Sequence, residues 1–198
     1  MADKDAFSRR GALTAALLLS LTAEAGRNHA HAAIPAAGGG RVLVAYYSRT
    51  GNTRVVARQI QLAYGAALFE IRTAEPYPDD YEATVRQAER ERQAGYRPPL
   101  AATLPSLDAY DVVFLGFPIW GTTAPAAVRS FLAAHDLSGK TLVPFITHGG
   151  YGPGSSVQVV AEHAPGARLL DAFTLRQDQE RETLAQVTSW MGGLAIDR

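Results

Sequence analysis

The chain has no cysteine among its 198 residues, and it has no excess charge, with 19 basic and 19 acidic side chains. Disulfides, cysteine metal sites and cysteine nucleophiles are therefore excluded. Nucleic-acid-binding domains are usually strongly basic, so the balanced charge argues against a nucleic-acid partner. Apolar residues make up 47% of the chain, which is enough for a packed core and too much for a disordered chain.

Two common phosphate-binding signatures are missing from the loop at 48–53, which reads S-R-T-G-N-T. No lysine follows its glycine, so a P-loop for a triphosphate is excluded. The G-x-G-x-x-G pattern is also missing there, which argues against a Rossmann dinucleotide site. Because no carboxylate pair, metal-ligand cluster or Ser-His-Asp set stands out, we predict neither a catalytic residue nor a metal site.

The chain has no apolar run long enough to cross a bilayer. The run at 11–23 falls short of the roughly twenty residues that a spanning helix needs. It follows Ser8-Arg9-Arg10, and Ala30-His31-Ala32 then offers a small-x-small cleavage site. Residues 1–32 are therefore predicted to be a signal peptide, with no membrane span in the mature form.

The paired arginines resemble a twin-arginine export signal, although Ala12 and Thr14 depart from its pattern. This resemblance implies export of the folded chain to a bacterial periplasm. A general secretory signal that happens to carry two arginines is the alternative. Residues 33–40 (A-I-P-A-A-G-G-G) have the composition of a flexible linker, and the folded domain is expected at 41–198.

Apolar, strand-like runs alternate with helical patterns from residue 41 onward. This alternation is typical of an α/β fold around a parallel sheet. The helix at 81–94 carries many arginines and glutamates, and we expect its charged face to be solvated. Strands are predicted at 41–47, 67–72, 112–116, 141–147 and 168–173, and helices at 52–64, 81–94, 124–134, 155–163 and 180–191.

The first loop, residues 48–53, connects the first expected strand to the first expected helix. Ser48, Thr50 and Thr53 supply hydroxyls, Asn52 an amide, and Gly51 freedom at positive φ. Backbone N–H groups at such a junction point into one concavity, and the helix dipole adds partial positive charge. The first loop therefore predicts a site for one terminal phosphate. The alternative is an ordinary turn whose Thr50 or Asn52 caps the helix.

The second loop, residues 117–123, reads F-P-I-W-G-T-T and follows the third expected strand. Pro118 stiffens it, Gly121 lets the backbone approach a ligand, and Trp120 offers a flat surface for a planar ring. Alternatively, Trp120 fills a hydrophobic gap beneath the loop. The carboxyl ends of parallel strands meet at one edge of a sheet, so the first and second loops are expected to share one site.

The third loop, residues 148–154, reads H-G-G-Y-G-P-G and follows the fourth expected strand. Its glycine-rich backbone can wrap the edge of a ring with amide groups. Tyr151 is expected either to cover the second face of that ring or to lie on the surface. His148 is interpreted as a structural hydrogen-bonding residue.

Four segments resemble the short flavodoxins: S-x-T-G-x-T in the first loop, L-G-F-P-I-W-G, T-H-G-G, and E-P-Y-P-D-D-Y at 75–81. The resemblance covers nearly all of 41–198. It implies a flavodoxin-like three-layer α/β/α sandwich with a five-stranded parallel sheet in the order 2-1-3-4-5, and flavin mononucleotide (FMN) as cofactor. The predicted cofactor-binding residues are Ser48, Arg49, Thr50, Gly51, Asn52, Thr53, Pro118, Ile119, Trp120, Gly121, Thr122, Gly149, Gly150, Tyr151 and Gly152.

The resemblance implies an exported electron-transfer protein that exchanges electrons with a redox partner protein or a membrane donor. An FMN-dependent reductase of quinones or other small molecules is the alternative, so whether the protein is an enzyme stays open. A flavin-free binding module that kept the fold is a third hypothesis. Flavodoxins that shuttle electrons are typically very acidic, whereas residues 33–198 carry 15 basic and 16 acidic side chains. Acidic steering toward a basic partner is therefore not expected.

Overall fold

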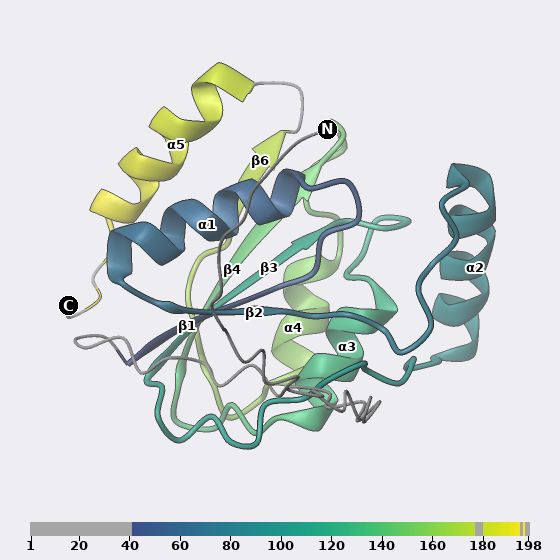
Figure 1. Cartoon of the computed structure of the whole chain (residues 1–198), viewed down its shortest axis with the longest axis horizontal. Helices are drawn as coiled ribbons and strands as arrows, with labels where there is room; N and C mark the ends of the chain where they lie inside the picture. Colours follow the sequence, from purple (N-terminus) through teal and green to yellow (C-terminus); the bar gives the residue numbers. More distant parts are fainter. Residues whose placement is uncertain (1–40, 177–179, 195, 197–198) are drawn as a thin grey trace, which may run out of the picture. The chain divides into compact units, whose positions relative to one another are not determined.

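A computed structural model of the chain describes residues 41–176, 180–194 and 196 (Figure 1). Strands and helices alternate along this part of the chain, as predicted. The expected signal peptide and linker lie outside the described residues. The strands are β1 (Val42–Tyr46), β2 (Ala67–Glu70), β3 (Val112–Pro118), β4 (Thr141–His148), β5 (Arg168–Leu169) and β6 (Phe173–Arg176). The helices are α1 (Asn52–Tyr64), α2 (Tyr81–Ala94), α3 (Ala126–Ala134), α4 (Ser156–His163) and α5 (Glu180–Gly192).

The strands form one parallel sheet in the order β2-β1-β3-β4-β5, which confirms the predicted order. The sheet differs from the prediction at its fifth position. Two short strands stand there in place of one, because β5 pairs with the start of β4 and β6 pairs with its end.

The break between β5 and β6 lies opposite Pro144 of β4. The register against β4 shifts by one residue between β5 and β6, so the outer chain holds one extra residue at this point. The carbonyl of Leu142 accepts a hydrogen bond from the N–H of Leu170 at 2.9 Å. Position 144 faces the same edge as position 142, since alternate residues of a strand bond to the same neighbour. Proline has no N–H to donate, which accounts for the interruption at this point.

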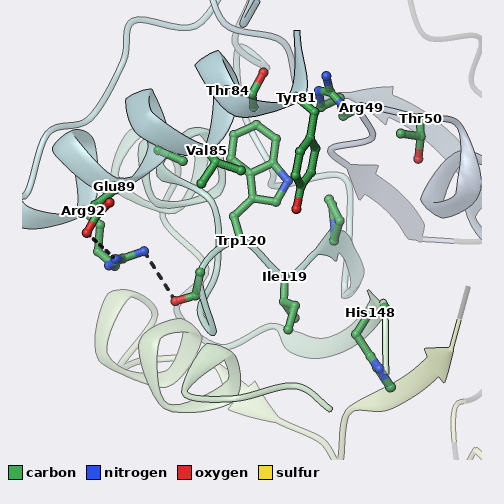
Figure 2. A pocket seen from close by; sticks show the side chains of 14 residues that line it. Arg49, Thr50, Tyr81, Thr84, Val85, Glu89, Arg92, Ile119, Trp120 and His148 are labelled. Atoms are coloured by element: carbon green, nitrogen blue, oxygen red, sulfur yellow. Dashed lines mark hydrogen bonds and ion pairs between the residues drawn. The ribbon is translucent and has the colours of Figure 1, made fainter. Parts of the chain in front are cut away.

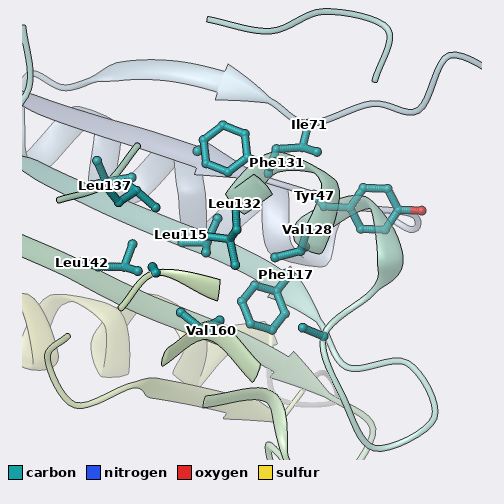
Figure 3. Packing of buried hydrophobic residues seen from close by; sticks show 14 of the residues in the cluster. Tyr47, Ile71, Leu115, Phe117, Val128, Phe131, Leu132, Leu137, Leu142 and Val160 are labelled. Carbon is teal, nitrogen blue, oxygen red and sulfur yellow. The ribbon is translucent and has the colours of Figure 1, made fainter. Parts of the chain in front are cut away.

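Each face of the sheet has its own buried core. Leu43 and Ala45 of β1 belong to the cluster that packs against α3 and α4, part of which is shown in Figure 3. Val44 and Tyr46 belong to the cluster on the other face, together with residues of α1 and α5. The side chains of β1 thus alternate between two helical layers, and the predicted α/β/α sandwich is confirmed (Figure 1).

The first, second and third loops lie at the carboxyl edge of the sheet, after β1, β3 and β4. Pairing with β4 extends β3 to Pro118, so the second loop begins two residues later than its strand prediction implied. Helix α2 stands at the same edge near α3 and does not cover the sheet (Figure 1). Within the described part of the chain, no helix has the length and apolar character needed to cross a membrane.

Candidate functional site

A pocket of about 360 Å³ opens at the carboxyl edge of the sheet (Figure 2). All three loops contribute to its wall, and α2 forms the remaining side. The residues that line it are Arg49, Thr50, Tyr81, Thr84, Val85, Ala88, Glu89, Arg92, Pro118, Ile119, Trp120, Gly121, His148 and Gly149. The pocket therefore joins the loop predicted to bind phosphate to the loops predicted to bind a ring.

The backbone of the first loop already surrounds an oxygen atom. The hydroxyl oxygen of Ser48 accepts hydrogen bonds from the N–H of Gly51 at 3.1 Å and of Arg54 at 3.4 Å. Gly51, the N-cap of α1, has φ 99° and no side chain with which to cap the helix. The N–H groups of this turn thus converge as an oxyanion requires.

The side chains of the first loop separate into two groups. Thr50 and Asn52 are exposed, and Thr50 lines the pocket. Thr53 is buried, and its hydroxyl oxygen lies 2.9 Å from that of Thr147 in β4. The Thr53 hydroxyl therefore has a protein partner, and what it offers a ligand is its backbone N–H. Ser48 lies on the other side of the loop, in a neighbouring hollow of about 650 Å³.

Two arginines bring positive charge to the first loop, Arg49 within it and Arg54 directly after it. Arg49 lines both the pocket and the neighbouring hollow. Its guanidinium donates a hydrogen bond to the backbone carbonyl of Asp79 at 2.6 Å, and this neutral acceptor does not compensate the positive charge. Arg54 is paired with the Glu70 carboxylate at 2.6 Å. Burial raises the pKa of Glu70, but hydrogen bonds from Arg54 and Arg72 outweigh it and hold the pKa below its usual value.

The second loop turns tightly between Trp120 and Thr123, whose backbone groups bond to each other at 2.8 and 3.2 Å. Both central residues have positive φ, 53° at Gly121 and 70° at Thr122. A Cβ at position 121 would meet the guanidinium of Arg92, the far end of a flexible side chain that can shift. Glycine is therefore favoured there mainly by its positive φ.

Trp120 both borders the pocket and fills the space beneath the second loop, the two roles expected for it as alternatives. It lines the pocket, and its ring also meets those of Tyr47 and Tyr77 edge-on, with centroids 5.3 and 4.7 Å away. The Tyr77 hydroxyl donates to the buried Glu91 carboxylate at 2.6 Å. Burial, and then Glu91, raises the pKa of Tyr77. The Trp120 ring thus packs against a partly buried tyrosine whose hydroxyl is hydrogen-bonded.

The third loop is organised around His148, in agreement with its structural interpretation. Its Nδ1 accepts hydrogen bonds from the N–H groups of Gly150 at 3.1 Å and Gly152 at 3.3 Å. Gly149 lines the pocket, whereas Tyr151 is 92% exposed and does not. Of the two expectations for Tyr151, the structure places it on the surface.

Seven of the fifteen predicted site residues line the pocket: Arg49, Thr50, Pro118, Ile119, Trp120, Gly121 and Gly149. The sequence interpretation missed the wall that α2 contributes, because the helix was expected to be solvated. The sequence feature that could have indicated this wall is a small stripe of less polar residues within a charged helix, Thr84, Val85 and Ala88. The spacing of Thr84 and Ala88 places them on one face.

The flavodoxin family's sequence model matches residues 41–192, which is most of the chain. The chain belongs to the flavodoxin family. Family membership confirms FMN as the cofactor expected from the three loops. The residues fit this group, since the loop whose N–H groups converge also reaches, through Arg49 and Thr50, the pocket that Trp120 lines.

Solved structures agree with this flavodoxin assignment. A candidate flavoprotein from Bacteroides eggerthii is 31% identical, covers 80% of this chain and 100% of its own, and superposes with a TM-score of 0.70. Its counterpart from Bacteroides uniformis is 32% identical, with coverage of 78% and 99% and a TM-score of 0.69. A Lactobacillus acidophilus flavoprotein in complex with FMN is 21% identical, with coverage of 74% and 99% and a TM-score of 0.59, and shares the fold. No curated protein sequence matches the chain.

Proposed function

We propose that this flavodoxin family member binds FMN across its three loops and transfers electrons through it. The observation that supports the proposal is the single pocket that connects the first loop to the second and third loops. Ligands of parallel α/β sheets bind at this edge, where the strand order reverses between β1 and β3.

Bound FMN would supply a ring that accepts and gives up electrons. In this chain, the N–H groups of the first loop and the Thr50 hydroxyl are suited to the phosphate. Trp120 offers its aromatic surface to the ring, and the backbone of Gly121 and Gly149 reaches the same pocket. These groups bind and orient the flavin and limit the access of water to it.

A reductase of quinones or other small molecules is the second candidate. Helix α2 favours it, because Val85 and Tyr81 line the pocket with exposed fractions of 45% and 70%. Such apolar groups at a pocket mouth suit a second planar molecule next to the flavin. Residues 33–198 are also nearly neutral in charge. They therefore do not attract a basic protein partner in preference to a small molecule or a membrane donor.

We extend the proposal to location: residues 1–32 export the folded protein to the periplasm, where a membrane or protein donor reduces it. Cell fractionation of the full-length protein tests this part. Recovery of a shortened chain in the periplasm supports it, and replacement of Arg9 and Arg10 by lysine should then block export through the twin-arginine route. An unprocessed chain in the cytoplasm would contradict it.

Calorimetric FMN titration tests the site. Thr50→Val should weaken FMN binding by about 1 kcal/mol, because a hydroxyl partner of the phosphate is lost. Trp120→Ala should weaken it further and shift the reduction potential. Thr103→Val, at an exposed position outside the pocket, is the control and should change nothing. Wild-type affinity in both pocket variants would overturn the assignment.

Turnover separates the two candidates. FMN-loaded protein is mixed with NAD(P)H and a soluble quinone, and quinone reduction is followed over time. Many turnovers per flavin indicate a reductase, and their loss in a bulkier Ala88→Phe variant would place the substrate against α2. Reduction limited to one equivalent of bound flavin indicates an electron carrier.

A further inference from the structure

A much smaller cavity of about 10 Å³ lies next to Trp120, between α2 and α3. This volume is at the lower limit for one bound water molecule, so only a single small group can enter the cavity. The residues that line it are Ala88, Arg92, Trp120, Thr123, Ala124, Pro125, Ala126 and Arg129. We call this cavity the arginine niche. It shares Ala88, Arg92 and Trp120 with the larger pocket.

Two buried polar atoms of the arginine niche have no hydrogen-bond partner, the hydroxyl oxygen of Thr123 and Nε of Arg129. Thr123 is only 5% exposed. A buried donor without a partner costs folding free energy, and such groups are uncommon in native proteins. Two of them around one cavity point to a ligand that both can reach.

Positive charge also gathers at the niche. Burial lowers the pKa of Arg129, and the neighbouring charges of Arg92 and Arg97 lower it further. Arg92 has a distant carboxylate partner, Glu89 at 3.9 Å, and a 3.4 Å contact with the Gly121 carbonyl. In the described part of the chain, no carboxylate lines the niche.

The amino end of α3 adds further donors. Pro125 precedes the helix, no side chain caps it, and its first turn holds no acidic residue. The first N–H groups of a helix lack partners within the helix, and its dipole favours negative charge there. Ala126, the first residue of α3, lines the niche.

We propose that the arginine niche binds a single anionic group between Thr123, Arg129 and Arg92. The polar side chains at hand supply hydrogen-bond donors and positive charge, which suits an anion and excludes a cation. The group has two sources, a free monovalent ion such as chloride or the carboxylate of an acidic compound whose body occupies the larger pocket. The proposal does not depend on FMN, because the first loop takes no part in the niche.

The first experiment measures the chlorine NMR line width of sodium chloride in the presence of the full-length, FMN-free protein. Slow tumbling of bound chloride broadens the signal. Wild-type protein should broaden it, and Thr123→Val and Arg129→Gln should each bind chloride roughly tenfold more weakly. Thr123→Val keeps the shape of the side chain, so it should fold even if Arg129→Gln does not.

The matched control is Arg86→Gln, which removes an exposed arginine of α2 that pairs with Glu82 outside the niche. It should keep the wild-type line width. Loss of broadening in this control to the same extent as in Thr123→Val would show non-specific charge attraction and would overturn the proposal.

The second experiment separates the two sources. Thermal unfolding is measured with sodium benzoate against sodium gluconate at equal ionic strength. A rise in the unfolding temperature with benzoate in wild type but not in Thr123→Val, without chloride broadening, assigns the niche to the carboxylate of an acidic compound. Chloride broadening without a benzoate effect assigns it to a free ion. No difference between wild type and Thr123→Val in either experiment means that water fills the niche, and the proposal fails.

Discussion

At the scale of single residues, the second loop depends on an unusual threonine. Thr122 has φ 70°, a region that β-branched residues rarely occupy. Its carbonyl accepts hydrogen bonds from the N–H and the hydroxyl of Ser155 at 2.9 and 3.3 Å, so the N-cap residue of α4 helps to hold this conformation. The strain costs on the order of 1 kcal/mol.

We therefore predict that Thr122→Asn stabilises the protein by about 1 kcal/mol, because asparagine tolerates positive φ. Urea unfolding measures the change. Thr122→Val, which keeps the branched side chain, is the control and should give no gain. A destabilised Thr122→Asn variant would mean that the Thr122 side chain itself makes a stabilising contribution.

Two tyrosines, Tyr47 buried and Tyr77 partly buried, predict how stability changes at high pH. Burial raises the pKa of Tyr47 and of Tyr77 in the folded state, and Glu91 adds to the shift. Above pH ~10 an unfolded chain releases these protons while the folded chain keeps them. The free energy of unfolding should therefore be unaffected below this pH and fall above it, by at most about 1.4 kcal/mol per pH unit for each tyrosine.

Denaturant unfolding between neutral pH and the alkaline range checks this prediction. Tyr77→Phe should make the alkaline slope shallower, even though loss of the bond to Glu91 lowers stability at neutral pH. Tyr151→Phe, at a position that is 92% exposed, should leave the slope as in wild type. An equal slope in Tyr77→Phe and wild type would contradict the assignment.

Sequence reasoning succeeded where a residue's role is local. His148 was interpreted as a structural hydrogen-bonding residue, and its Nδ1 accepts hydrogen bonds from the N–H groups of Gly150 and Gly152. The partner of Thr53 was not readable, because Thr147 lies 94 residues further along the chain. Tertiary contacts of this kind decide which hydroxyl remains available to a ligand.

At the scale of elements, α2 forms one wall of the pocket. Asp80 begins this helix as its N-cap. We predict that Asp80→Ala costs about 1 kcal/mol of stability and weakens FMN binding, because the helix that walls the pocket starts to fray. Thermal unfolding and FMN titration measure the two effects.

Asp79→Ala is the matched control, since it removes the same charge one residue earlier. Only the backbone carbonyl of Asp79 contacts Arg49, and this contact survives the substitution. We expect nearly wild-type stability and affinity. Equal losses in the two variants would show that local charge matters and the cap does not.

The observed strands and helices differ from the predicted ones where pairing between strands, and not the local sequence pattern, determines their bounds. The fifth strand reads as one segment in the sequence, and only the register against Pro144 explains its division into β5 and β6. Helix α2 was located correctly, but its arginines and glutamates hid the face that turns toward Trp120. A helix that lines a ligand pocket need not show a strong apolar stripe.

At the scale of the whole molecule, cofactor binding should stabilise the fold. Free FMN at one hundred times its dissociation constant should add about 2.7 kcal/mol to the free energy of unfolding. For a domain of this size that corresponds to a rise in Tm of roughly 5–10 °C. Differential scanning fluorimetry measures it.

Riboflavin, which lacks the phosphate, is the natural control ligand for this measurement. It should raise Tm much less than FMN at the same concentration, because it leaves the first loop unoccupied. Equal shifts with the two ligands would remove the first loop from the site while leaving the ring pocket in place.

The strand order was predictable because four segments resemble the short flavodoxins, and that resemblance implies the order 2-1-3-4-5. The pocket's outline was predictable because three unusual loops follow the first, third and fourth apolar runs, which a parallel sheet brings to one edge. Its depth and the arginine niche were not, since both depend on where α2 packs against the second loop.

The divided outer strand also has a consequence for the behaviour of the protein at high concentration. A long, regular strand at the border of a sheet can recruit the same strand of another molecule and start aggregation. Here one border is β2, with four residues, and the other is broken at 170–172 into pieces of two and four residues. Neither border offers a continuous template, so crowding should not drive these molecules to add to one another strand by strand.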